Sequence, residues 1–335
     1  MGAACRPALA HGERAVDVTR GAATPRTQRA APPTAGSSAS PSLRALTESS
    51  RSLWTAGRRL ERASYLIGAV LIVSGVAHLG VYALAGGPWE GPVSWRKAVT
   101  FGVAFGLTVI AFVALSSFLV ASPRIRRLVV GIFVAACVLE VVLVTAQAWR
   151  QVPSHFNRET GFDSAISSVL AAGGAAIVAT SMAMTVLALR RRPAAPPSGV
   201  LAIRAGTIIF LVALAIGVAM IAKGVALERT VSAAAAYTGG GSLKPAHAVP
   251  MQAIIVLPVI AWLLAFHRCS ERSRHRLVAL ATAGYALVTG AVIIESFASV
   301  DPLAPTVALG AASAVGLATV IGVGLTPLAG ALRPI

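Results

Sequence analysis

Apolar stretches recur along the chain from residue 64 onward, and short polar connections separate them. An α-helix needs about 20 predominantly apolar residues to cross a bilayer, and each stretch has this length. We predict eight spans, at roughly 64–85, 98–121, 128–149, 165–189, 200–223, 248–266, 276–297 and 304–330. The pattern therefore predicts an all-α fold, a polytopic transmembrane helix bundle with the lipid bilayer as its surroundings.

The N-terminal part of the chain lacks this pattern. Residues 1–62 are rich in Ala, Pro, Ser, Thr and Arg and show no apolar periodicity. Such a composition is typical of disorder, so we interpret 1–62 as a disordered basic cytoplasmic tail and 63–335 as the transmembrane helical domain.

The two halves of the transmembrane domain share short sequence matches. A serine followed by basic residues begins the second and the sixth span, at Ser94 and Ser242, and Glu140 and Glu295 lie in the third and the seventh. These matches indicate a duplication of 64–189 as 200–330, although so short a pattern also arises by chance.

Basic residues collect in alternate connections and so predict the orientation. One set of connections holds Arg58, Arg59, Arg62, Arg124, Arg126, Arg127, Arg190, Arg191, Arg192, Arg268, Arg272, Arg274, Arg276 and Arg333. The opposite set holds Glu90, Glu159, Asp163, Glu228 and Asp301. Because positively charged connections stay on the cytoplasmic side, we expect both termini in the cytoplasm.

Composition narrows the function classes. The chain of 335 residues is 56% hydrophobic and 12% charged, with a net charge of +17. The basic residues lie in the tail and between spans, where they set orientation, so we expect no nucleic-acid partner. The three cysteines, Cys5, Cys137 and Cys269, are far apart and form no CxxC pair, so the sequence offers neither a disulfide framework nor a thiolate metal site.

Glu140 lies deep inside the third predicted span, about 18 Å along its helix. An ionisable group at this depth costs about 2.5–3.5 kcal/mol on insertion scales unless something compensates. Glu140 must therefore face the bundle, either protonated or paired with a cation, and the alternative to a functional role is a structural bond between helices. The same segment continues through Gln147 and Arg150 to His155 and Asn157.

Further polar residues fall in the outer half of other predicted spans. They are His78, Arg96, Lys97, Lys223, Lys244, His247 and Glu295. Each also has a structural interpretation, such as headgroup anchoring for Arg96 and Lys97 or a carbonyl bond for His78. We interpret Glu140, His155 and His247 as candidate catalytic residues. The candidate ligand-binding residues are His78, Arg96, Lys97, Gln147, Arg150, Asn157, Lys244 and Glu295.

Four segments together resemble a known family. They are Gly91–Lys97, Gln147–Asn157 with Phe162 and Asp163, Ala202–Arg204, and Gly241–His247 with Leu257 and Pro258. They resemble a family of uncharacterised, mainly actinobacterial multi-pass membrane proteins, with Ser154-His155-Phe156-Asn157 as the most specific part. The resemblance implies a multi-helix fold in the bacterial plasma membrane and no assigned activity. This chain has Gln252 where relatives tend to have a second histidine, which argues against a histidine-rich metal or haem site.

Three kinds of function fit these residues. One is an outward-facing intramembrane site that binds or transports a small lipophilic or anionic molecule. Another is a membrane enzyme that uses Glu140 as a general acid on a lipophilic, isoprenoid-like substrate, as a terpene cyclase does. The last is a haem or metal redox protein with His78 and His247 as ligands. No standard catalytic motif decides between them, and the sequence assigns neither a cofactor nor an oligomeric state.

Overall fold

The computed structural model describes residues 41–239, 241–267, 269–301 and 304–331, so the predictions for residues 1–40, Arg268 and Arg333 lie outside the described residues. The described residues form helices joined by short connections and no β-strand. The helices are α1 (Pro41–Thr55), α2 (Arg59–Ala85), α3 (Trp95–Ser116), α4 (Pro123–Trp149), α5 (Gly161–Arg190), α6 (Pro197–Thr230), α7 (Ala233–Gly239), the 3₁₀ turn η1 (Gly241–Leu243), α8 (Lys244–Met251), α9 (Ala253–Leu264), α10 (Glu271–Phe297) and α11 (Val307–Ala331).

Eight segments of the described chain are long and apolar enough to cross a membrane, which confirms the predicted all-α multi-span fold. They are α2, α3, α4, α5, α6, α8 with α9, α10 and α11. The chain therefore has the architecture of a multi-pass integral membrane protein. The cytoplasmic location of both termini stays a prediction, as does the internal duplication.

Helix α1 lies in the segment that the sequence assigns to a disordered tail. Its residues 41–55 form an amphipathic helix, which three residues connect to α2. The side chain of Trp262 in α9 donates a hydrogen bond of 3.0 Å from Nε1 to Ser49 Oγ. This bond links α1, whose polar composition gives no span-like pattern, to the bundle.

Helices α2 and α3 approach each other through glycines. A Cβ on Gly102 would lie 2.6 Å from the Cα of Gly75, and one on Gly106 would lie 2.5 Å from the carbonyl oxygen of Gly68. Such close backbone packing is the usual way in which membrane helices associate where no hydrophobic driving force acts between them. Helices α10 and α11 meet in the same way at Gly284 and Gly316.

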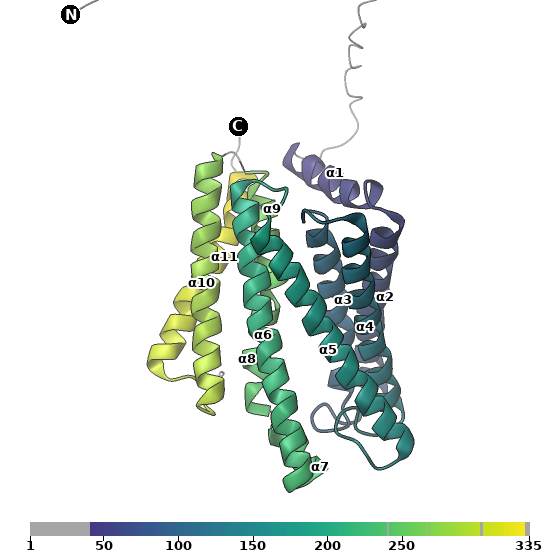
Figure 1. Ribbon diagram of the computed structural model, residues 1–335. Helices are drawn as coiled ribbons and strands as arrows, with labels where there is room; N and C mark the ends of the chain where they lie inside the picture. The colour runs from purple at the N-terminus through teal and green to yellow at the C-terminus, as the bar shows by residue number, and fades with distance from the viewer. Residues whose placement is uncertain (1–40, 240, 268, 302–303, 332–335) are drawn as a thin grey trace, which may run out of the picture. The chain divides into compact units, whose positions relative to one another are not determined.

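Helix α6 connects two groups of helices. It contacts α5 on one side and α8, α9 and α10 on the other. In Figure 1 it runs between the group α2–α5, coloured purple to teal, and the group α8–α11, coloured green to yellow. Its C-terminal end continues into α7, which packs on α6 and so brings Tyr237 toward the connection between α4 and α5.

Candidate functional site

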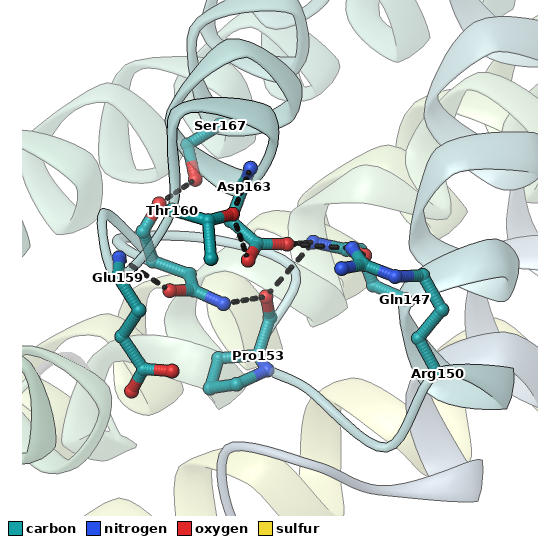
Figure 2. A network of polar contacts seen from close by, with 8 residues as sticks. Gln147, Arg150, Pro153, Glu159, Thr160, Asp163 and Ser167 are labelled. Atoms are coloured by element: carbon teal, nitrogen blue, oxygen red, sulfur yellow. Dashed lines mark hydrogen bonds and ion pairs between the residues drawn. The ribbon is translucent and has the colours of Figure 1, made fainter.

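A polar network closes the connection between α4 and α5 (Figure 2), and Asp163 is at its centre. The carboxylate of Asp163 is buried and accepts hydrogen bonds from Gln147 Nε2 at 3.0 Å, Arg150 Nη1 at 2.5 Å and Thr160 Oγ1 at 2.6 Å. Arg150 also donates to the side-chain oxygen of Gln147. The end of α4 is therefore joined to the start of α5 by charge-assisted bonds.

The rest of the connection is held by Asn157. Its Nδ2 donates to the carbonyl of Pro153 at 3.4 Å, and its Oδ1 accepts from the backbone amide of Glu159 at 3.1 Å. Ser167 Oγ of α5 donates to the Asn157 carbonyl at 3.0 Å. The sequence predicts Gln147, Arg150 and Asn157 as ligand contacts. In the structure their side chains hydrogen-bond within the connection itself and so shape the loop that carries Ser154 and His155.

A narrow crevice lies beside this loop. It is lined by Pro92, Val93 and Ser94 before α3, Lys97 in α3, Val144 and Ala148 in α4, and Val152 and Ser154 in the loop. The side chains leave no space for a water molecule, so a ligand can enter only when they move. The Ser94 hydroxyl is buried, makes no capping bond to α3, and has no hydrogen-bond partner among the described residues.

Lys97 is the charged group of the crevice. Its Nζ donates to the carbonyl of Pro92 at 2.7 Å and lies 4.8 Å from the ring centroid of Tyr237. The charged groups that act on it are Lys244 at the start of α8 and Arg96, and both are cationic. Arg96 is paired with Glu90 at 3.0 Å, whereas Lys97 and Lys244 have no salt bridge among the described residues. The fold therefore places Lys244, which does not line the crevice, within electrostatic range of Lys97.

His155 lies behind this cationic group. Its Nδ1 shares a hydrogen bond of 2.9 Å with Ser154 Oγ, and its ring contacts Phe101 of α3. Burial, and secondarily the charge of Lys97, lowers the pKa of His155 from 6.5 to about 4. The imidazole is therefore neutral near pH 7 and accepts or donates hydrogen bonds without adding charge.

The lowered pKa of His155 predicts an acid-sensitive fold. Between about pH 6.5 and about 4 the unfolded chain binds a proton at this residue that the folded chain does not, so stability falls as the pH falls through this window. We expect His155→Gln to reduce the loss of melting temperature over this window by a few °C. Thermal unfolding of detergent-solubilised protein against pH tests this, with the exposed His275→Gln as control. If the melting temperatures of wild type and His155→Gln fell equally with pH, His155 would not be the source of the acid sensitivity.

Tyr237 joins the site from α7 and is not among the residues predicted from the sequence. Its ring lies 5.9 Å from that of Phe156, whose tip packs against Gly224 of α6, where a Cβ would clash. Burial, followed by the charges of Glu159 and Glu228, raises the pKa of the Tyr237 hydroxyl. This hydroxyl lies near the backbone of His155 without hydrogen-bond geometry. A lone tyrosine after an alanine run gives no sequence signal of this role.

His78 lies in an aromatic cluster next to the site. Its Nδ1 donates to the carbonyl of Ser74 at 2.7 Å, and its Nε2 accepts from Trp149 Nε1 at 3.0 Å. Trp95 stacks on the ring with centroids 6.0 Å apart. Both ring nitrogens already make hydrogen bonds. The geometry therefore fits a structural histidine bonded to a carbonyl better than a residue that binds a ligand.

Glu140 is buried between helices, as expected, and of the two predicted states the structure offers no cationic partner for it among the described residues. Its carboxyl faces the glycine pair Gly173 and Gly174 of α5, and a Cβ on Gly173 would lie 2.9 Å from Oε1. No salt bridge to Glu140 occurs among the described residues. Val144, one turn further along α4, lines the crevice and packs with Ile166 and Leu170, so a layer of apolar side chains separates Glu140 from it.

His247 and Glu295 lie with the other group of helices. His247 Nδ1 donates to the carbonyl of Ala213 in α6 at 2.7 Å, and its ring packs on Gly217. Glu295 of α10 is 1% exposed, and its Oε1 has no hydrogen-bond partner in the part of the chain that is described. The structure therefore brings together Arg96, Lys97, His155 and Lys244, joins Gln147, Arg150 and Asn157 in the adjoining loop, and leaves Glu140, His247 and Glu295 in separate packing environments.

Comparison with models of known families, with curated proteins and with solved structures gives no match. The fold and the described side chains alone define the class, a multi-pass helical membrane protein with a cationic crevice at one end of its bundle. The resemblance of the Ser154–Asn157 segment to an uncharacterised family stays a prediction.

Proposed function

We propose that the protein binds a small anionic group of an amphiphilic molecule at the crevice around Lys97, in the plasma membrane of a bacterium. The observation that carries this proposal is the pair of lysines, Lys97 and Lys244, which repel each other and have no carboxylate partner among the described residues. An anion between them removes the repulsion, and charge-assisted hydrogen bonds from ammonium groups are the strong ones.

The neighbouring polar groups fit the same ligand chemistry. The unpartnered hydroxyl of Ser94 stands at the N-cap position of α3, where backbone amides and the helix dipole favour an anion. Ser154 supplies a second hydroxyl on the other wall. Neutral His155 adds no charge of its own, so the positive potential comes from the lysines. The exposed Trp149 beside Ala148 offers an apolar surface for the rest of an amphiphile.

Binding requires the crevice to open. Lys97 must leave the Pro92 carbonyl or the ring of Tyr237 in order to reach a ligand. We therefore expect the side chain of Tyr237 in α7 and the loop before α3 to move when a ligand binds. A bound ligand should also stabilise the protein by mass action.

Octyl phosphate is a suitable probe, with octanol as its uncharged counterpart. We expect octyl phosphate to raise the melting temperature of the protein in a neutral detergent, and octanol to leave it unchanged. Lys97→Gln should weaken the apparent affinity roughly tenfold to hundredfold, because one charged partner of the anion is lost. Lys223→Gln, which removes an exposed lysine of α6, is the matched control.

Two results would contradict the proposal. One is the absence of any difference between octyl phosphate and octanol with the wild-type protein. The other is an equal response of wild type and Lys97→Gln, which would show that the phosphate acts on the detergent or on surface charge in general.

A further inference from the structure

Helix α1 presents exposed apolar side chains at the arginine-rich end of the bundle. Leu53 is 39% exposed and Trp54 is 42% exposed, and both lie in the last turn of α1. Figure 1 shows α1 at a steep angle to α2, at the end of the bundle where α2 begins. The bond from Trp262 to Ser49 ties α1 to α9, so this helix is held near the bundle and does not project from it.

The same end of the bundle carries uncompensated positive charge. Successive spans run in opposite directions, so the starts of α2 and α4 and the end of α5 lie on one side. Exposed arginines there without a salt bridge among the described residues include Arg51, Arg58, Arg59, Arg62, Arg124 and Arg127. The salt bridges at this end involve Arg126 with Glu61 and Arg274 with Glu271.

We propose that α1 is an interfacial helix that docks on acidic phospholipid headgroups. Leu53 and Trp54 insert among the acyl chains just below the headgroups, and Arg51, Arg58 and Arg59 bind lipid phosphates. Tryptophan with arginines on a short amphipathic helix is typical of helices that lie in the membrane interface.

The geometry favours lipid over another macromolecule. Only residues 56–58 separate α1 from α2, the first helix that is long and apolar enough to span a bilayer. The helix is therefore confined to the height of the headgroups, where anionic lipids attract juxtamembrane arginines. Its apolar residues are too few to form a stable protein interface on their own.

Trypsin cleavage after Arg51 and Arg58 measures whether α1 is docked. The full chain is reconstituted in nanodiscs of phosphatidylcholine alone or of phosphatidylcholine mixed with phosphatidylglycerol, and the cleavage products are quantified by mass spectrometry. We expect cleavage to be roughly tenfold slower in the anionic discs, because trypsin acts on the undocked population. The double variant Leu53→Ser with Trp54→Ser should lose this protection, and Ser52→Ala, a polar change on the same helix, should keep it.

Three outcomes would overturn the proposal. They are equal cleavage of the wild type in both discs, full protection of the double variant, and protection in neutral discs by a DNA oligonucleotide instead of by phosphatidylglycerol. The last would assign the arginines to nucleic acid. All substituted side chains are exposed, and a size-exclusion profile like that of the wild type confirms that each variant is folded.

Discussion

Gly106→Ala is expected to lower the melting temperature of the detergent-solubilised protein by roughly 5–10 °C. The added Cβ would lie 2.5 Å from the Gly68 carbonyl oxygen and 2.6 Å from Ile72 Cγ1. Real Cβ atoms do not approach backbone oxygens so closely, so α2 must move away from α3. This separation also loosens the contact between Gly75 and Gly102, and overpacking of this kind costs about 1–3 kcal/mol or more.

Gly80→Ala is the matched control for this prediction. Gly80 lies in α2, the helix against which Gly106 of α3 packs, and a Cβ there meets no atom within 4 Å. Alanine is favoured over glycine in a helix by about 1 kcal/mol, so this variant should be neutral or slightly more stable. If both alanine variants melt at the same temperature, the glycine contact between α2 and α3 does not hold the bundle together.

The spans were predictable because length and apolarity decide them, whereas α1 was not. Each span needs an uninterrupted apolar run, and such runs are visible without any knowledge of partners. Helix α1 contains Arg51, Ser52 and Glu48 among few apolar residues, and so it resembles the polar tail before it. Its hydrogen-bond partner Trp262 lies more than two hundred residues away in the sequence, so no local pattern indicates the contact.

Part of the site was predictable from topology. Alternation of the spans places Lys97, His155 and Lys244 at one end, and the structure brings these three together. Their exact neighbours depend on tertiary packing. Two of these contacts have no counterpart in local sequence patterns. They are the glycine pair of α5 that faces Glu140 and the hydrogen bond from Trp149 to His78.

Asp163 was missed although a local signal existed. From the sequence, Asp163 counts as an acidic residue of an outer connection and as part of a segment that resembles a known family, but not as a candidate site residue. However, Thr160 and Asp163 have the threonine-x-x-acid spacing that marks a helix start, and Thr160 Oγ1 does accept a hydrogen bond from the Asp163 amide at 3.0 Å. This spacing predicts the beginning of α5. It does not predict that the carboxylate also accepts hydrogen bonds from Gln147 and Arg150 at the end of α4.

Asp163→Asn is expected to destabilise the protein and to release the loop between α4 and α5. The asparagine has the same size, but it loses the negative charge and one of the two acceptor oxygens. Either Gln147 and Arg150, which bond Oδ1, or Thr160, which bonds Oδ2, then meets an amide nitrogen and loses its acceptor. We expect a melting temperature lower by roughly 5 °C or more, and faster hydrogen exchange in residues 151–160. Because this loop positions Ser154 and His155, the response to octyl phosphate should weaken as well.

Two comparisons separate the network from a general effect of removing charge. Glu159→Gln removes an exposed acid from the same loop. Glu159 bonds Asn157 through its backbone amide and not through its carboxylate, so this variant should leave the melting temperature nearly unchanged. Arg150→Gln, alone and combined with Asp163→Asn, tests the pair directly. If the two residues act through their mutual bond, the double variant should be less destabilised than the sum of the single ones, since the first change already removes what the second would remove. Additive losses would mean that Asp163 stabilises the loop through Thr160 and Gln147 without Arg150.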